Sequence, residues 1–166
     1  MNREIKFRAW HKKYKEMYEV TRIDWEAEFV WVKYYDDDRE EWFSREEHFV
    51  DLELMQYIGR KDENDDCIFQ EDIASVIIQR HVFGFYQETE YVGIVKYDEK
   101  ECVYYLDLLK KPIESGETIP DEIDGISISS ESDEELERFY FNEYIVEEDI
   151  RILGNAYENK ELLKND

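Results

Sequence analysis

Carboxylates are the side chains of this sequence that could do chemistry, and their densest motif is Asp62-Glu63-Asn64-Asp65-Asp66. Its first, third and fifth residues have the spacing of acids and amides in a calcium-binding loop. The sixth position, which needs glycine, is Cys67, and the twelfth, which needs a bidentate glutamate, is Ile73. The segment therefore predicts a solvated turn, and we expect neither a metal site nor another cofactor.

Histidine and cysteine are too scattered to form a recognised site. His11, His48 and His81 have no second ligand residue at a repeated spacing. Cys67 and Cys102 form no CxxC motif, so reduced thiols are expected, with one disulfide as the alternative. No GxSxG motif, phosphate-binding glycine loop or dinucleotide fingerprint occurs. These observations favour a protein that is not an enzyme.

Paired carboxylates could still serve acid–base catalysis. Because 44 of the 166 residues are acidic, such pairs arise by chance throughout the chain and carry little information. A carboxylate-based hydrolase is therefore the least favoured of the functional hypotheses.

The net charge of −23 narrows the list of partners more than any motif does. It repels phosphate backbones and anionic lipid, and it attracts basic proteins. We therefore expect a protein partner, no membrane and no direct binding of nucleic acid. Residues 1–22 run against this trend with seven bases and three acids. This basic segment is expected to lie against the acidic body of its own chain or of a neighbouring copy, so a homo-oligomer is also considered.

The most acidic stretch, residues 112–137, contains ten acids and no Lys or Arg. Such a composition predicts a mobile, solvated insert. The residues that we expect to contact a partner are the acids Asp121, Glu122, Asp124, Asp133, Glu134 and Glu135. An alternative is nucleic-acid mimicry. Acids at alternate positions of a strand lie about 6.6 Å apart, so rows of them can imitate the phosphates of duplex DNA, which carries one charge per about 1.7 Å.

Short runs of alternating apolar and polar residues dominate the rest of the chain. Residues 5–10, 28–35, 73–79, 91–97 and 103–109 have the composition of strands, and only six Gly and two Pro interrupt the chain. Strands this short and regularly spaced predict an all-β fold, with a small antiparallel barrel. No signal peptide or apolar run of membrane-spanning length is present, so we expect a cytoplasmic protein.

Several blocks resemble the YopX family of phage and prophage proteins. They are Arg3–Trp10, Leu54–Gly59 followed by Lys61–Asn64, Asp72-Ile73, Gly93–Tyr97 and Ile152–Asn159. The resemblance implies a mostly β protein whose C-terminal part looks like an SH3-type barrel. It also implies carriage on a mobile genetic element and work in a bacterial cytoplasm, without an implied activity.

The chain departs from the family pattern at two turns. It has Asn64-Asp65 where the family usually has Asn-Gly, and Glu71-Asp72 where the family usually has Gly-Asp. Asp tolerates a left-handed backbone less well than Gly, and Glu is harder to accommodate there. We expect an N-terminal β region, residues 1–57, and an SH3-like barrel, residues 58–166, that the insert interrupts. The favoured function is a non-enzymatic accessory protein acting through protein–protein contacts.

Overall fold

The computed structural model describes residues 4–118, 120, 122–123, 126–127, 136–141 and 145–164. These residues form almost entirely antiparallel strands, which confirms the all-β class. The chain divides into two compact units, Met1–Arg60 with Cys67–Glu71, and Lys61–Asp66 with Asp72–Asp166. The division into domains 1–57 and 58–166 stays a prediction.

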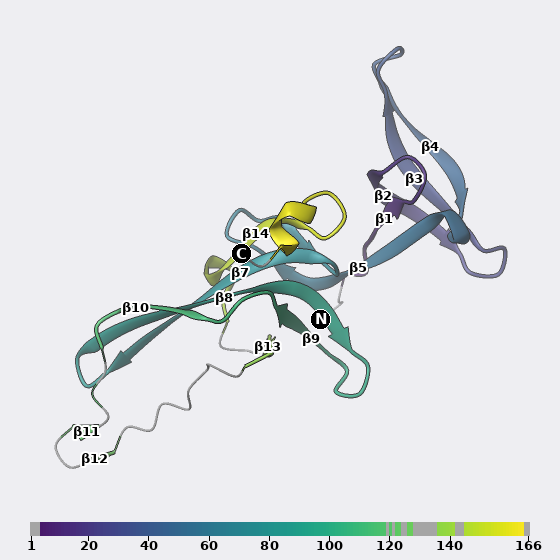
Figure 1. The fold of residues 1–166 in the computed structure, drawn as a ribbon. Helices are drawn as coiled ribbons and strands as arrows, with labels where there is room; N and C mark the ends of the chain where they lie inside the picture. The colour runs from purple at the N-terminus through teal and green to yellow at the C-terminus, as the bar shows by residue number, and fades with distance from the viewer. Residues whose placement is uncertain are drawn as a thin grey trace. The chain divides into compact units, whose positions relative to one another are not determined.

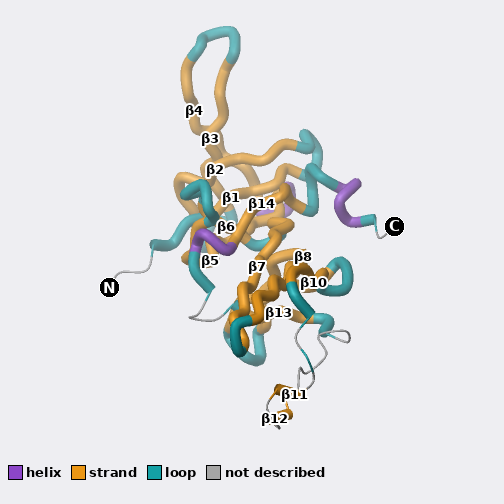
Figure 2. Tube along the Cα trace, turned by 90° about the vertical axis from the view of Figure 1, so that its left-hand side faces the viewer, coloured by secondary structure: helices purple, strands orange, loops and turns teal. Residues whose placement is uncertain are grey.

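The first unit is a six-stranded sheet in the order β4-β3-β2-β1-β5-β6. Its elements are β1 (Phe7–His11), β2 (Glu16–Asp24), β3 (Phe29–Asp36), β4 (Glu41–His48), the 3-10 turn η1 (Phe49–Asp51), β5 (Leu52–Lys61) and β6 (Cys67–Phe69). The first four strands follow one another as hairpins, and the tube in Figure 2 shows β3 and β4 as a long hairpin. One buried hydrophobic cluster of this unit consists of Ala9, Tyr18, Val30, Val32 and Leu52.

The second unit is built on a sheet in the order β13-β9-β8-β7-β14. Its elements are β7 (Asp72–Val82), β8 (Phe85–Asp98), β9 (Val103–Leu108), β10 (Ile113–Gly116), β13 (Arg138–Tyr140), the 3-10 turn η3 (Glu147–Asp149), β14 (Ile150–Asn155) and the 3-10 turn η4 (Lys160–Leu163). A separate pair joins β11 (Glu122–Ile123) and β12 (Ile126–Ser127). Figure 1 shows β7 and β8 as a long twisted hairpin with β10 along its far end.

The prediction of a closed barrel is wrong. Closure of a barrel requires the two edge strands to pair, whereas the described strands of the second sheet form an open path that ends at β13 and β14. The cause lies in β8, whose 14 residues exceed the length of every strand that pairs with it, including the 11 residues of β7. It pairs with β9 through Gly93–Asp98 and with β10 through Gln87–Glu90, so its two halves lead to different neighbours.

The expected mobile insert begins with a strand. Residues 113–116 form β10, which sequence analysis missed because its four residues are all exposed and show no apolar alternation. Much of the remainder of 112–137 lies outside the described residues, and its mobility stays a prediction.

Both turns that depart from the family pattern adopt a left-handed backbone. Asp65 has φ of 68° and Glu71 has φ of 66°. These values explain why glycine suits both positions, because a Cβ is unfavourable there. In this chain the turns keep their shape with a side chain present, at the cost of local strain.

Candidate functional site

The candidate site lies on one face of the second sheet, where strands β7, β8 and β14 run side by side. Ser75 of β7 is opposite Arg151 of β14, and Ile77 of β7 is opposite Glu90 of β8. Because side chains alternate between the faces of a strand, these four residues share one face. The other face carries the buried core residues, among them Val76, Tyr91, Leu106 and Ile150.

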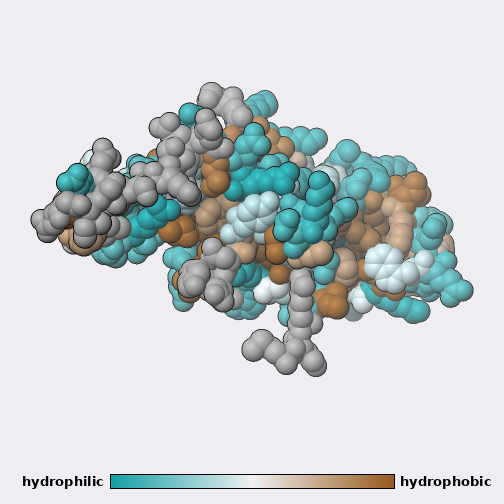
Figure 3. Space-filling model, turned by 90° about the horizontal axis from the view of Figure 1, so that it is seen from below, coloured by the Kyte–Doolittle hydropathy of each residue, from teal (hydrophilic) through white to brown (hydrophobic). Residues whose placement is uncertain are grey.

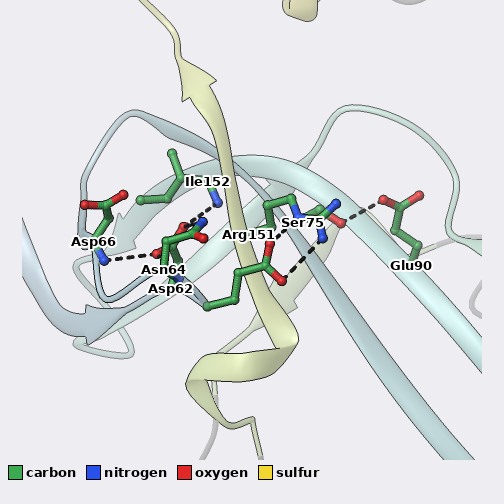
Figure 4. A network of polar contacts seen from close by, with 8 residues as sticks. Asp62, Asn64, Asp66, Ser75, Glu90, Arg151 and Ile152 are labelled. Atoms are coloured by element: carbon green, nitrogen blue, oxygen red, sulfur yellow. Dashed lines mark hydrogen bonds and ion pairs between the residues drawn. The ribbon is translucent and has the colours of Figure 1, made fainter.

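Two polar pairs organise this face. Figure 4 shows Ser75 and Glu90 on one side of β14, and Asp62, Asn64 and Asp66 of the neighbouring turn on the other. The Ser75 hydroxyl donates to Glu90 Oε1 at 2.7 Å. The Arg151 guanidinium holds Glu63 in a bidentate pair, with Nε 2.5 Å from Oε1 and Nη2 3.3 Å from Oε2. The hydrogen bond to Glu63 raises the pKa of Arg151 above its usual value, and the charge of Glu90 adds to the shift.

The turn that presents Glu63 is held by the buried carboxylate of Asp62, which is only 3% exposed. Asp62 Oδ1 accepts the backbone N–H groups of Asn64 at 2.9 Å and Asp66 at 3.0 Å, and Oδ2 accepts the N–H of Ile152 at 3.3 Å. Glu63 N–H donates to the carbonyl of Ile150 at 2.9 Å. The turn is thereby fastened to the outer side of β14.

Opposing effects set the charge of Asp62. Burial acts to raise its pKa, but the backbone N–H groups of Asn64, Asp66 and Ile152 favour the ionised form and outweigh it. The net result is a pKa below the ordinary value of 3.8. The predicted turn is confirmed, and its first carboxylate serves to hold backbone amides.

An acidic pocket of ≈ 70 Å³ opens between these pairs. Its lining residues are Glu63, Ser75, Ile77, Glu90, Glu148, Asp149, Ile150, Arg151 and Leu153. Ligand pockets for drug-sized molecules measure about 300–1,000 Å³, so this pocket suits the head group of a single side chain. Four carboxylates against one guanidinium favour a cationic head group.

A second cluster lies in the first unit, around the buried His11. Its Nδ1 accepts the N–H of Lys13 at 3.2 Å, and its Nε2 lies 3.3 Å from Glu47 Oε2. Glu47 Oε1 is 2.6 Å from Arg45 Nε, and the Arg45 guanidinium donates to the Tyr18 hydroxyl at 3.0 Å. Because both ring nitrogens and both carboxylate oxygens already have partners, this arrangement joins β1, β2 and β4 more readily than it serves a substrate.

Neither site was found from the sequence. The residues of the acidic pocket come from four separate segments, and only the turn at residues 62–66 gave a signal. Of the residues expected to contact a partner, Asp121, Asp124, Asp133, Glu134 and Glu135 lie outside the described residues. Glu122 is exposed on β11, where it is opposite Ser127. Their role stays a prediction.

Three further observations apply to the part of the chain that the structure describes. No group of three or more His, Cys, Asp or Glu side chains in this part of the chain could hold a metal ion. Cys67 and Cys102 are free thiols. No helix within the described ranges has the length and apolar character needed to cross a membrane.

Comparison with known proteins gives a family assignment. No curated protein matches the chain. The crystal structure of protein EF1440 from Enterococcus faecalis is similar over 98% of this chain and 100% of that chain, with 18% sequence identity and a TM-score of 0.49. The model of the YopX protein family matches residues 6–164, which is nearly the whole sequence. The chain therefore belongs to the YopX protein family.

Proposed function

We propose that this protein is a non-enzymatic accessory protein of a phage or prophage that binds a basic protein partner in the bacterial cytoplasm. The acidic pocket is its contact site for a lysine or arginine side chain of that partner. The observation that carries the proposal is the gathering of Glu63, Glu90, Glu148 and Asp149 around one small cavity.

The state of these carboxylates supports recognition over catalysis. Glu63 has both oxygens on Arg151, and Glu90 accepts from Ser75 while lying 3.6 Å from the Lys110 ammonium. A general base needs a carboxylate within hydrogen-bond reach of the substrate proton. Carboxylates fixed by neighbours instead present a preorganised negative field to a cation.

Capture from a bacterial lysate tests the proposal. The wild type is compared with Glu90→Gln/Glu148→Gln, which removes two charges from the acidic pocket, and with Glu99→Gln/Glu101→Gln, which removes two charges from the β8–β9 turn. We expect the wild type and the turn variant to retain a basic protein at low salt, and the pocket variant to lose it. Equal loss by both variants would show that net charge alone is responsible, and would refute the role of the pocket.

Nucleic-acid mimicry is the second candidate, favoured by the spacing of Glu88 and Glu90. They are alternate residues of β8 and share one face with Gln79 and Ile77. The same capture experiment separates the candidates when duplex DNA is added. Mimicry predicts that the duplex displaces the captured partner, whereas an ordinary acidic contact predicts that the complex persists.

A further inference from the structure

A second cavity of ≈ 570 Å³ lies beside the acidic pocket on the same unit. Its apolar lining is Ile73, Val92, Leu109, Leu153 and Leu162, and its charged lining is Glu90, Lys110, Lys111 and Lys164. We call this cavity the lysine groove. The two cavities share the lining residues Glu90 and Leu153, so they are direct neighbours on this unit.

Two of the lysines, Lys110 and Lys111, lie in the segment that joins β9 to β10. Between the end of β9 and the start of β10 the chain crosses beside β8, and Leu109 N–H donates to the carbonyl of Val92 at 2.9 Å. This contact fixes the segment that carries Lys110 and Lys111. The backbone next to Lys110 and Lys111 is therefore held beside β8.

A compact turn places the third lysine. Asn155 Oδ1 accepts the N–H groups of Tyr157 at 3.1 Å and Glu158 at 2.9 Å, and Asn159 Oδ1 accepts the N–H of Asn155 at 3.0 Å. A Cβ on Gly154 would lie 2.4 Å from Asn159 Oδ1, so glycine permits this close approach. The turn leads directly into η4, which supplies Leu162 and is followed by Lys164.

The lysine groove is unusual in so acidic a chain. Residues 23–166 contain 41 acids and 14 bases, yet three of those bases gather here. Lys110 pairs with Glu90, whereas Lys111 and Lys164 have no carboxylate partner among the described residues. Leu153 and Leu162 beside them are 41% and 40% exposed. Figure 3 shows, on the face that it draws, apolar patches among hydrophilic side chains.

We propose that the acidic pocket and the lysine groove together bind one extended peptide segment of the partner protein. A basic side chain of the segment enters the acidic pocket, apolar side chains cover Leu153 and Leu162, and carboxylates contact Lys111 and Lys164. The inference rests on the proposed function and adds the order of charges that the partner must present. Complementary charges suppress partners with the wrong pattern, and at about 0.15 M salt a local patch acts within about 8 Å.

Three labelled synthetic peptides test this order by fluorescence anisotropy at about 0.15 M salt. The bipolar peptide carries one arginine, two leucines and two glutamates, in that order and separated by serines. In the basic peptide glutamine replaces both glutamates, and in the acidic peptide glutamine replaces the arginine. We expect the bipolar peptide to bind about threefold to tenfold more tightly than either of the others, because exposed ion pairs contribute modestly.

Charge-swapped proteins provide the matched comparison. In Lys111→Glu/Lys164→Glu the advantage of the bipolar peptide over the basic peptide should disappear. In Lys15→Glu/Lys100→Glu, which makes the same change of net charge at other exposed positions, the advantage should persist. Circular dichroism confirms that each variant is folded before its binding is compared.

The outcomes separate the two proposals. Equal binding of the bipolar and basic peptides to the wild type would overturn the charge order and leave the acidic pocket as a contact site. Loss of the bipolar advantage in both swapped proteins would also overturn it. Failure of both arginine-containing peptides to bind the wild type would refute the acidic pocket itself, and with it the proposed function.

Discussion

Replacement of Asp62 by asparagine should destabilise the protein, although it removes one negative charge from a chain whose net charge is −23. Net charge alone predicts the opposite, because self-repulsion falls when an acid is neutralised. The substitution therefore shows which effect on stability is larger: the loss of local hydrogen bonds in the turn, or the relief of charge repulsion across the whole protein.

The size of the effect follows from the contacts of the carboxylate. Asparagine keeps one oxygen for the N–H groups of Asn64 and Asp66, but it places an NH₂ group opposite the N–H of Ile152. A hydrogen bond to a charged group contributes about 1.5–3 kcal/mol. We expect Asp62→Asn to lower the free energy of unfolding by about 2 kcal/mol and Asp62→Ala by about 3 kcal/mol.

Urea unfolding followed by circular dichroism measures the loss, and hydrogen exchange of the Ile152 amide locates it at β14. Since the pKa of Asp62 is lowered in the folded state, its contribution is present above pH 3.8 and is lost as the pH falls through the folded value. The difference in stability between the wild type and Asp62→Asn should therefore stay constant from pH 7 down to about pH 4 and begin to shrink only as the pH falls below 3.8.

Asp65→Asn is the matched control, because Asp65 is an exposed acid of the same turn whose carboxylate pairs with Lys61. Its effect should stay within about 0.5 kcal/mol. The reasoning fails if Asp62→Asn unfolds at the same urea concentration as Asp65→Asn, or if the difference between wild type and Asp62→Asn does not depend on pH.

Three further perturbations give independent checks, each measured by thermal unfolding. Gly93→Ala should cost about 2–3 kcal/mol, because its Cβ would lie 2.6 Å from the backbone oxygen of Asp107, and an unchanged melting temperature would contradict this packing. Glu71→Gly should stabilise by about 1 kcal/mol by relieving its left-handed backbone, and a lower melting temperature would show that the side chain offsets the strain. Moderate salt should raise the melting temperature of the wild type by screening the charge of −23, and a flat response would show that the exposed acids repel little.

The local pattern of apolar and polar residues was sufficient to predict individual strands. It was not sufficient to predict whether the strands close into a barrel. The alternation in residues 28–35 and the β-branched run in 73–79 correctly predicted β3 and β7, because one or both faces of these strands are buried. The barrel failed because closure depends on which edges meet, and no local signal specifies that the two halves of β8 have different partners. β4 was missed because its exposed residues, such as Glu41 and Trp42, give no clear apolar face.

The candidate site was beyond local reasoning for a different reason. Asn64-Asp65 marked the turn, and the left-handed backbone at Asp65 agrees with that signal. The contact between Arg151 and Glu63 spans 88 positions of the sequence. In a chain where acids are common, the carboxylates that converge in the fold do not differ in sequence from those that face solvent.

The hydrogen bonds between the turn at residues 62–66 and β14 also determine where the second sheet ends. The edge strand of a sheet normally has unpaired backbone N–H and C=O groups. These groups can pair with a strand of another chain and so lead to aggregation. Here the carbonyl of Ile150 and the amide of Ile152 are already occupied by Glu63 and Asp62. A folded turn with one ionised side chain thus covers that edge of the sheet, and it should keep these hydrogen bonds until the pH falls through the lowered pKa of Asp62.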